Sequence, residues 1–179
     1  MNKVARITIH EKAGYLADAV FAASDGIVTT FAVVAGSAGA SLDNRIVLIL
    51  GFANLFADGF SMASGRFLGV KSEIEYEQTK GKETKSEGTP IKHGMMTFVA
   101  FNIAGLIPLI SFLIKMPSPF AASALLVGAA LFLVGFLGSI YTKQNVIKSG
   151  FISFAVGGFA AFIAFAVGYL LRAFVAPSF

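Results

Sequence analysis

Five apolar stretches, each long enough to cross a lipid bilayer, dominate this chain. A spanning helix requires about 20 mainly apolar residues at a rise of about 1.5 Å per residue. Stretches that meet this requirement lie at roughly 15–40, 46–70, 95–115, 120–142 and 150–175. Because unpaired backbone groups are too costly in hydrocarbon, such segments fold as helices. The sequence therefore predicts an all-α, polytopic membrane protein with five transmembrane helices.

The composition favours a single transmembrane domain over residues 1–179. Hydrophobic residues make up 56% of the chain and charged residues only 13%, which leaves too little polar sequence for a sizeable soluble domain. The net charge of +4 is more typical of orientation signals beside a membrane than of a nucleic-acid site. We therefore expect a lipid bilayer and no nucleic acid as partner. Cysteine is absent, which excludes disulfide and thiolate chemistry.

The basic residues predict which end of the chain faces the cytoplasm. Cytoplasmic loops of membrane proteins carry an excess of Lys and Arg. With the N-terminus in the cytoplasm, eleven of the 14 basic residues fall on the cytoplasmic face and three on the other. We therefore expect a cytoplasmic N-terminus. Residues 71–93 then form a short cytoplasmic loop, whose first part, through Gln78, can continue the second helix into water.

Two aspartates lie deep inside the first two apolar stretches. Asp25 lies in SDGIVTTFAVVAG and Asp58 in ANLFADGFSMASG. At 1.5 Å per residue, each lies about 15 to 18 Å from the point where its span enters the bilayer. An ionised side chain at that depth costs at least about 2.5 to 3.5 kcal/mol, so such residues usually face a bundle interior or an ion path. Because the two spans are antiparallel neighbours, we expect their carboxylates at similar height.

Both helices carry a polar stripe at helical spacing, and its atoms suit a metal ion. Carboxylate and amide oxygens are hard ligands, whereas the Met62 thioether is a soft ligand that favours a transition ion such as Fe²⁺. Exchange of metal for protons at the same carboxylates would couple the two fluxes. Structural roles remain open: Asp25 and Asp58 can bond between helices, Met62 can fill space, and Asn54 can bridge helices through its amide.

Acidic residues outside the middle of the spans have weaker functional signals. Glu73 and Glu77 share a helix face at i and i+4, where they either collect cations loosely or form a solvated surface. Asp18 lies nearer the cytoplasmic surface and is either solvated or paired with Lys12 or Arg66. Glu73 and Glu77 are expected to steer cations weakly at most.

Other motifs point away from enzyme chemistry. His10 and His93 fall outside the predicted spans and have no partner at metal-ligand spacing, so we expect them at the surface. Pro108 removes a backbone hydrogen bond within the third span and is expected to kink it. No nucleophile with its base, HExxH pair or nucleotide loop is present. We therefore expect no enzymatic activity, no catalytic residues and no resident cofactor.

Four segments carry a characteristic order of motifs. They read SDGIVTTFAVVAG, LGFANLFADGFSMASGRFLGVKSEIEYE, FNIAGLIPLI and SGFISFAVGGFAAFIAFAVG. In order and spacing they resemble the helices of the vacuolar iron transporter family, over nearly the whole chain. The resemblance implies a five-helix protomer that forms a homodimer, with a metal path between the subunits. It also implies that Fe²⁺ or Mn²⁺ leaves the cytoplasm in exchange for protons, both being substrates.

Two residues of this chain match metal-site positions of the family, and a third position differs from the family. Asp25 matches the family's first-helix aspartate and Met62 its second-helix methionine. Better-studied eukaryotic members carry a glutamate eight residues before that methionine, where this chain has Asn54, and we infer that Asp58 supplies the missing charge. Those members also carry a cytoplasmic metal-binding domain between the second and third helices, which is absent here. The expected metal-binding residues are Asp25, Asp58, Met62, Asn54, Glu73 and Glu77.

The membrane and the mode of transport follow from the same resemblance. A short form without the cytoplasmic domain is expected in the plasma membrane of a prokaryote, or in the vacuolar membrane if the source is eukaryotic. Two alternatives remain open: a metal-permeable channel without proton coupling, and a membrane scaffold that transports nothing. Metal uptake with an opposing proton flux would separate these three functions.

Overall fold

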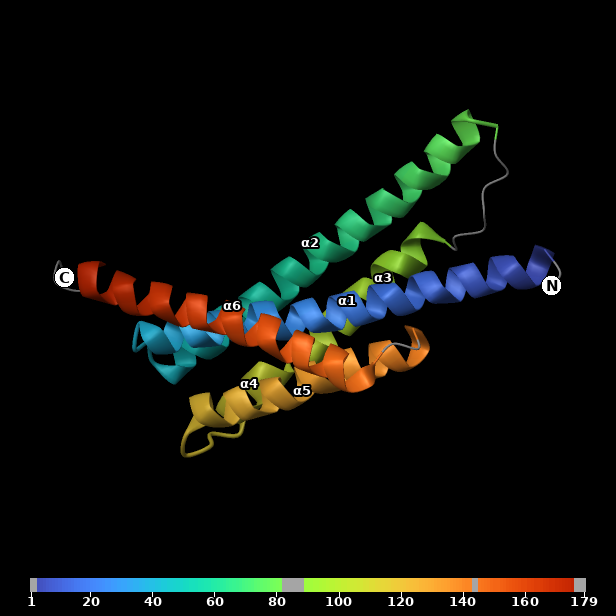
Figure 1. Ribbon diagram of the computed structural model, residues 1–179. Coiled ribbons are helices and arrows are strands. Elements are labelled where there is room, and N and C mark those ends of the chain that lie inside the picture. Colours follow the sequence, from blue (N-terminus) through green and yellow to red (C-terminus); the bar gives the residue numbers. More distant parts are fainter. Residues whose placement is uncertain (1–2, 82–88, 143–144, 176–179) are drawn as a thin grey trace.

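The structure, a computed structural model, describes residues 3–81, 89–142 and 145–175. Within these ranges there are helices and no strands (Figure 1). The helices are α1 (Lys3–Gly39), α2 (Asn44–Thr79), α3 (Pro90–Gly105), α4 (Ile107–Leu113), α5 (Pro119–Thr142) and α6 (Val146–Val175). The prediction of an all-α fold is confirmed.

Four of these helices, α1, α2, α5 and α6, are each long and apolar enough to cross a membrane, and α3 with α4 makes a fifth candidate span. The helices extend beyond the apolar stretches from which they were predicted. Helix α1 begins at Lys3, and α2 continues to Thr79, so the first part of the segment 71–93 is helical as expected. Residues 82–88 of that segment lie outside the described residues.

The third span is broken, and the axes of α3 and α4 differ by 41°. Pro108 lies in the first turn of α4 and has no N–H to donate to the carbonyl of Ala104, so the helix cannot continue unbent. Two serines then tie α4 to α5. The Ser123 hydroxyl donates to the Pro108 carbonyl, and the Ser111 hydroxyl donates to the Pro119 carbonyl, each at 2.7 Å. The predicted kink at Pro108 is confirmed.

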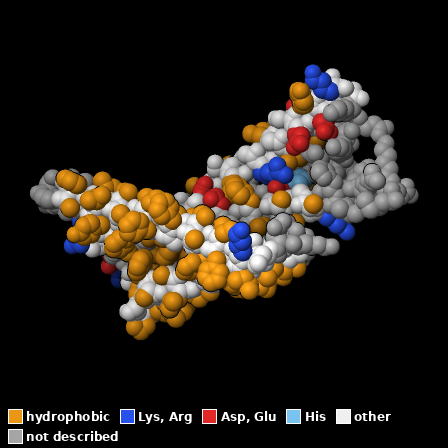
Figure 2. Space-filling model, viewed as in Figure 1, with side chains coloured by type: hydrophobic (Ala, Val, Ile, Leu, Met, Phe, Trp, Pro, Cys, Tyr) orange, Lys and Arg blue, Asp and Glu red, His pale blue; other side chains and the backbone are white. Residues whose placement is uncertain are grey.

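Helix α1 is the centre of the bundle and contacts all five other helices. Its Ile27, Phe31 and Val34 are buried in the main apolar core. Large apolar side chains are also widely exposed on the outside of the bundle, and they cover the surface over α5 and α6 in Figure 2. Such a surface would be unusual in water and fits a surrounding bilayer.

Glycines allow α1 to approach two neighbouring helices closely. A Cβ on Gly26 would lie 2.4 Å from the carbonyl oxygen of Phe101 in α3, and a Cβ on Gly168 of α6 would lie 2.0 Å from the carbonyl oxygen of Gly36. Small residues at helix interfaces in membranes permit this close backbone contact. These two contacts hold α1 directly against α3 and α6.

The chain termini lie at opposite ends of the bundle (Figure 1). The N-terminus lies at the same end as the end of α2 and the start of α3, whereas the α1–α2 turn and the end of α6 lie at the other. This arrangement is the one expected for an odd number of spans. That the N-terminal end faces the cytoplasm stays a prediction.

Candidate functional site

Asp25 of α1 and Asp58 of α2 are neighbours in the middle of the bundle. Both side chains are half-buried, and they are close enough for their negative charges to repel each other. The Thr29 hydroxyl donates to the backbone carbonyl of Asp25 at 2.9 Å. This bond lies within α1 and does not involve the Asp25 carboxylate. The fold thus brings together the two carboxylates that the sequence placed at similar depth.

Met62 and Asn54 lie one turn to either side of Asp58 on α2. The half-buried Met62 packs against a small apolar cluster formed by Ala22, Leu55 and Phe101. The Nδ2 atom of Asn54 is buried and has no hydrogen-bond partner within the described part of the chain. The helix bridge that the sequence allowed for this amide nitrogen is therefore not formed there, and the nitrogen is available to water or a ligand.

Glu73 and Glu77 lie on the part of α2 that extends beyond the bundle. Glu73 is exposed and Glu77 is half-buried, and between them Glu75 forms an ion pair with Lys71 at 3.8 Å. Among the described side chains, no three His, Cys, Asp or Glu residues converge into a group that could hold a metal ion. One copy of the chain therefore spreads the predicted metal residues along α1 and α2 and does not gather them at one point.

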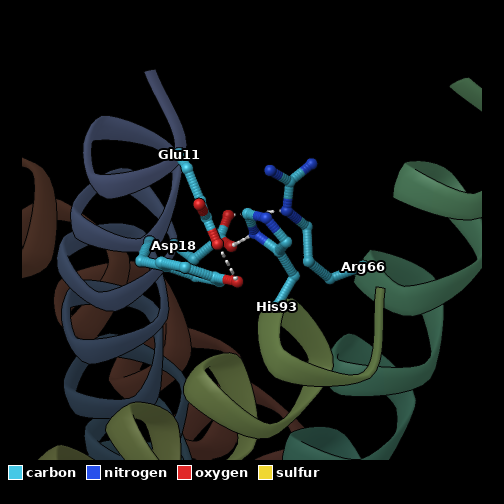
Figure 3. A network of polar contacts seen from close by, with 5 residues as sticks. Glu11, Asp18, Arg66 and His93 are labelled. Carbon is cyan, nitrogen blue, oxygen red and sulfur yellow. Dashed lines mark hydrogen bonds and ion pairs between the residues drawn. The ribbon is translucent and has the colours of Figure 1, made fainter. Parts of the chain in front are cut away.

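A buried polar network joins α1, α2 and α3 toward the N-terminal end of the bundle (Figure 3). Nε of Arg66 donates to Oδ1 of Asp18 at 2.6 Å, and Nδ1 of His93 shares a hydrogen bond with Oδ2 of the same carboxylate. The Tyr15 ring lies over the His93 ring, with 4.4 Å between centroids, and the Tyr15 hydroxyl donates to Glu11 at 3.2 Å. Asp18 is thus the point at which the three helices meet.

Burial and pairing within this network decide one open alternative and contradict one prediction. The exposed fraction is 6% for Asp18 and 1% for His93, whereas the Arg66 side chain remains 37% exposed. Of the alternatives that the sequence left open for Asp18, the structure shows the pairing with Arg66. The prediction that His93 lies at the surface was wrong, because α3 begins at Pro90, ahead of the predicted span, and turns His93 toward α1. His10 lies outside the described side chains.

The burial of His93 could have been predicted from Asp18 in α1 and not from the residues around the histidine. A carboxylate in an apolar stretch requires partners from neighbouring helices, and Asp18 has two oxygens for which Arg66 provides one donor. A second partner was therefore to be expected, and His93 lies at the same end of the bundle.

Asn102 of α3 is a further polar residue that the sequence analysis did not single out. Its Nδ2 donates to the Phe98 carbonyl at 2.9 Å, while its Oδ1 is buried without a partner among the described residues. The side chain lies against Gly59, where a Cβ would come within 2.6 Å of Nδ2. Asn102 thus adds an unsatisfied amide oxygen beside the turn of α2 that carries Asp58. A lone amide within an apolar span was the signal for it.

Similarity to known proteins covers most of the chain. The VIT family pattern matches residues 16–89 and 79–169. Vacuolar iron transporter homolog 4 of Arabidopsis thaliana is 34% identical over 160 residues, which cover 84% of this chain and 80% of that protein. The vacuolar iron transporter of Toxoplasma gondii is 26% identical over 225 residues (88% and 74%), and VIT-like transporter 1b of Glycine max is 28% identical over 168 residues (84% and 73%). Because the family pattern covers both halves of the bundle, from α1 to α6, this chain belongs to the VIT family.

Proposed function

We propose that this chain carries a divalent transition metal, Fe²⁺ or Mn²⁺, out of the cytoplasm in exchange for protons, as a homodimer. Membership of the VIT family makes it a transporter and not an enzyme, and relatives named vacuolar iron transporters support iron as cargo. The observation that carries the proposal is the pair of half-buried carboxylates, Asp25 and Asp58, on adjacent spans.

Charge balance explains how this pair can exchange metal for protons. Two neighbouring carboxylates within the membrane repel each other and are poorly solvated. A divalent cation neutralises both, and so does a proton on each, so the two kinds of cargo compete for the same oxygens. Met62 adds a soft sulfur ligand one turn away, and Asn54 adds a hard amide oxygen on the other side. Metal leaves as protons arrive, which couples the opposing fluxes.

The exposed surface of α2 supports a dimer. Small residues recur at every fourth position, and all of them are exposed: Ala53, Ala57, Ser61, Gly65 and Gly69. A Cβ added at Gly65 or Gly69 would meet no atom within 4 Å. Stripes of this kind let membrane helices pack closely. Since this stripe adjoins Asp58 and Met62, a second copy packed on it would add its own carboxylates and complete a ligand set that one copy spreads out.

The orientation and membrane complete the proposal. The N-terminal end of the bundle faces the cytoplasm, where Glu73 and Glu77 collect cations loosely before these reach Met62 and the two aspartates. The plasma membrane of a prokaryote is the proposed location, or the vacuolar membrane if the source is eukaryotic.

Metal uptake into proteoliposomes tests this function. Vesicles bearing the wild-type protein should accumulate Mn²⁺ or Fe²⁺ and show an opposing proton flux with a pH-sensitive dye. Asp25→Asn should abolish both fluxes. Asp43→Asn is the matched control, because Asp43 is exposed in the α1–α2 turn and caps α2 by accepting from the Arg45 N–H at 2.8 Å, which asparagine can also do.

Each alternative has its own outcome in this assay. Equal uptake by Asp25→Asn would remove Asp25 from the mechanism. Metal uptake that does not change with an imposed pH gradient would indicate a channel without proton coupling. Vesicles that take up no metal would indicate a membrane scaffold that transports nothing.

A further inference from the structure

The cluster of Asp18, Arg66 and His93 lies along the proposed metal path. Arg66 is four residues beyond Met62 on α2, which places it about 6 Å further along the axis and rotated by about 40°. Glu73 follows seven residues later, about 10 Å beyond Arg66. Figure 2 shows the same order on the surface, with basic and histidine side chains between acidic groups over the end of α2 and near the middle of the molecule. A permanent positive charge thus separates the outer glutamates from the inner aspartates.

An unpaired guanidinium at this position would oppose the passage of a cation. Arginine stays protonated in proteins, and its field extends over about 8 Å at physiological ionic strength. Here, however, Asp18 accepts from Nε of Arg66 at 2.6 Å. The pair carries no net charge, so a divalent cation that passes it meets little repulsion.

His93 holds the other oxygen of the same carboxylate. Its Nδ1 shares a hydrogen bond with Oδ2 of Asp18, and the residue is 1% exposed. The carboxylate is therefore fixed from α3 while its Oδ1 accepts from Arg66 on α2. His93 thus positions the charge that neutralises the guanidinium.

We propose that Asp18, Arg66 and His93 form an electrostatic gate at the cytoplasmic mouth of the metal path. Asp18 holds and neutralises Arg66, which lets the metal pass, and His93 keeps the Asp18 carboxylate in place beside the guanidinium. The gate rests on the proposed function, because it acts on a metal in transit.

Initial rates of Mn²⁺ uptake in proteoliposomes test the two charges. Asp18→Asn should raise KM about tenfold at low salt, because the freed Arg66 charge now repels the metal, while the maximal rate changes little. Added salt should reduce this rise, since Arg66 is 37% exposed and its field is screened. Arg66→Met should leave KM at or below the wild-type value. The double variant Asp18→Asn/Arg66→Met should return KM to the wild-type range.

Two variants test His93 separately. His93→Ala removes the partner of Oδ2 of Asp18 and should raise KM, because the carboxylate is no longer held beside Arg66. His93→Gln should keep KM near the wild-type value, because glutamine can still donate to Asp18. A merely structural role for His93 would lower the yield of folded protein and leave KM unchanged in both variants.

Several outcomes would overturn the gate. An unchanged KM in folded Asp18→Asn would do so, as would a double variant in which KM stays high or a wild-type KM in folded His93→Ala. If Asp18→Asn does not fold, Arg66→Met decides, since a raised KM in that variant would mean that Arg66 assists the metal. A wild-type protein that takes up no Mn²⁺ would overturn the proposed function, and the gate with it, whereas wild-type uptake with unaltered variants would overturn the gate alone.

Discussion

Polar side chains inside this bundle are of two kinds. Asp18 has a partner on each carboxylate oxygen, whereas Asn54 and Asn102 each bury one amide atom without a partner among the described residues. A buried polar atom without a hydrogen bond costs about 1 to 3 kcal/mol, so such atoms are retained where water or a ligand completes them. Both amides flank the turn of α2 that carries Asp58. These two amides therefore lie in the same region as Asp58, while the hydroxyls of Thr30 and Thr97 are likewise buried without a partner among the described residues.

Met62 offers a test that separates packing from metal binding. Met62→Leu keeps the contacts with the apolar cluster, so the free energy of unfolding should change by less than about 1.5 kcal/mol. Loss of the sulfur should nevertheless slow uptake of Fe²⁺, measured as the initial rate in proteoliposomes. Met95→Leu is the matched control, because Met95 is 62% exposed on α3, and it should change neither quantity. Wild-type uptake by Met62→Leu would reduce Met62 to a packing residue.

The depth of single residues was easier to predict than their partners. The similar height of Asp25 and Asp58 followed from counting, because the rise per residue of a helix is fixed. The burial of His93 depends instead on how α3 is rotated against α1, which is set by contacts between residues 75 positions apart. Spacing within one segment carries no information on that rotation.

The helices of this bundle are longer than the apolar segments from which they were predicted. Hydropathy marks the apolar part of each span, but α1 and α2 continue past it as charged and polar helix into Lys3 and Thr79. Backbone hydrogen bonds continue in water as well as in lipid, so an apolar window underestimates the length of a helix. The break between α3 and α4 was predictable because Pro108 acts locally, through its missing N–H.

Close contact between helices gives a test at this scale. Gly26→Ala would place a Cβ 2.4 Å from the Phe101 carbonyl oxygen, which must push α1 away from α3. Overpacking of this kind typically costs about 1 to 3 kcal/mol. Unfolding in mixed micelles, followed by circular dichroism, should show this loss. Gly158→Ala in α6 is the control, since a Cβ there meets no atom within 4 Å and alanine is the better helix former. An equal loss in both variants would mean that the α1–α3 contact is not its cause.

The whole molecule has a clear polarity, because its termini lie at opposite ends. The absence of cysteine makes that polarity easy to measure. A single cysteine at Gln78, exposed at the end of α2, should react with a membrane-impermeant maleimide only after intact cells are permeabilised. A cysteine at Met116, between α4 and α5, should react in intact cells. The reverse pattern would place the N-terminus outside, and the unmodified chain is the blank.

The described His, Cys, Asp and Glu side chains of one copy of the chain do not form a group of three that could hold a metal ion. The proposed metal site therefore depends on a second copy. If the small-residue stripe of α2 forms the dimer interface, Gly65→Leu should fill the space that the partner helix needs. Light scattering in detergent should then give the 18.8 kDa of one chain instead of twice that mass, and metal uptake should be lost. Gly158→Leu is the control, because Gly158 is also exposed but lies on α6, and it should remain dimeric and active. A Gly65→Leu protein that stays dimeric and transports metal would place the interface on another face, and a monomer that still transports would show that one bundle contains the whole path.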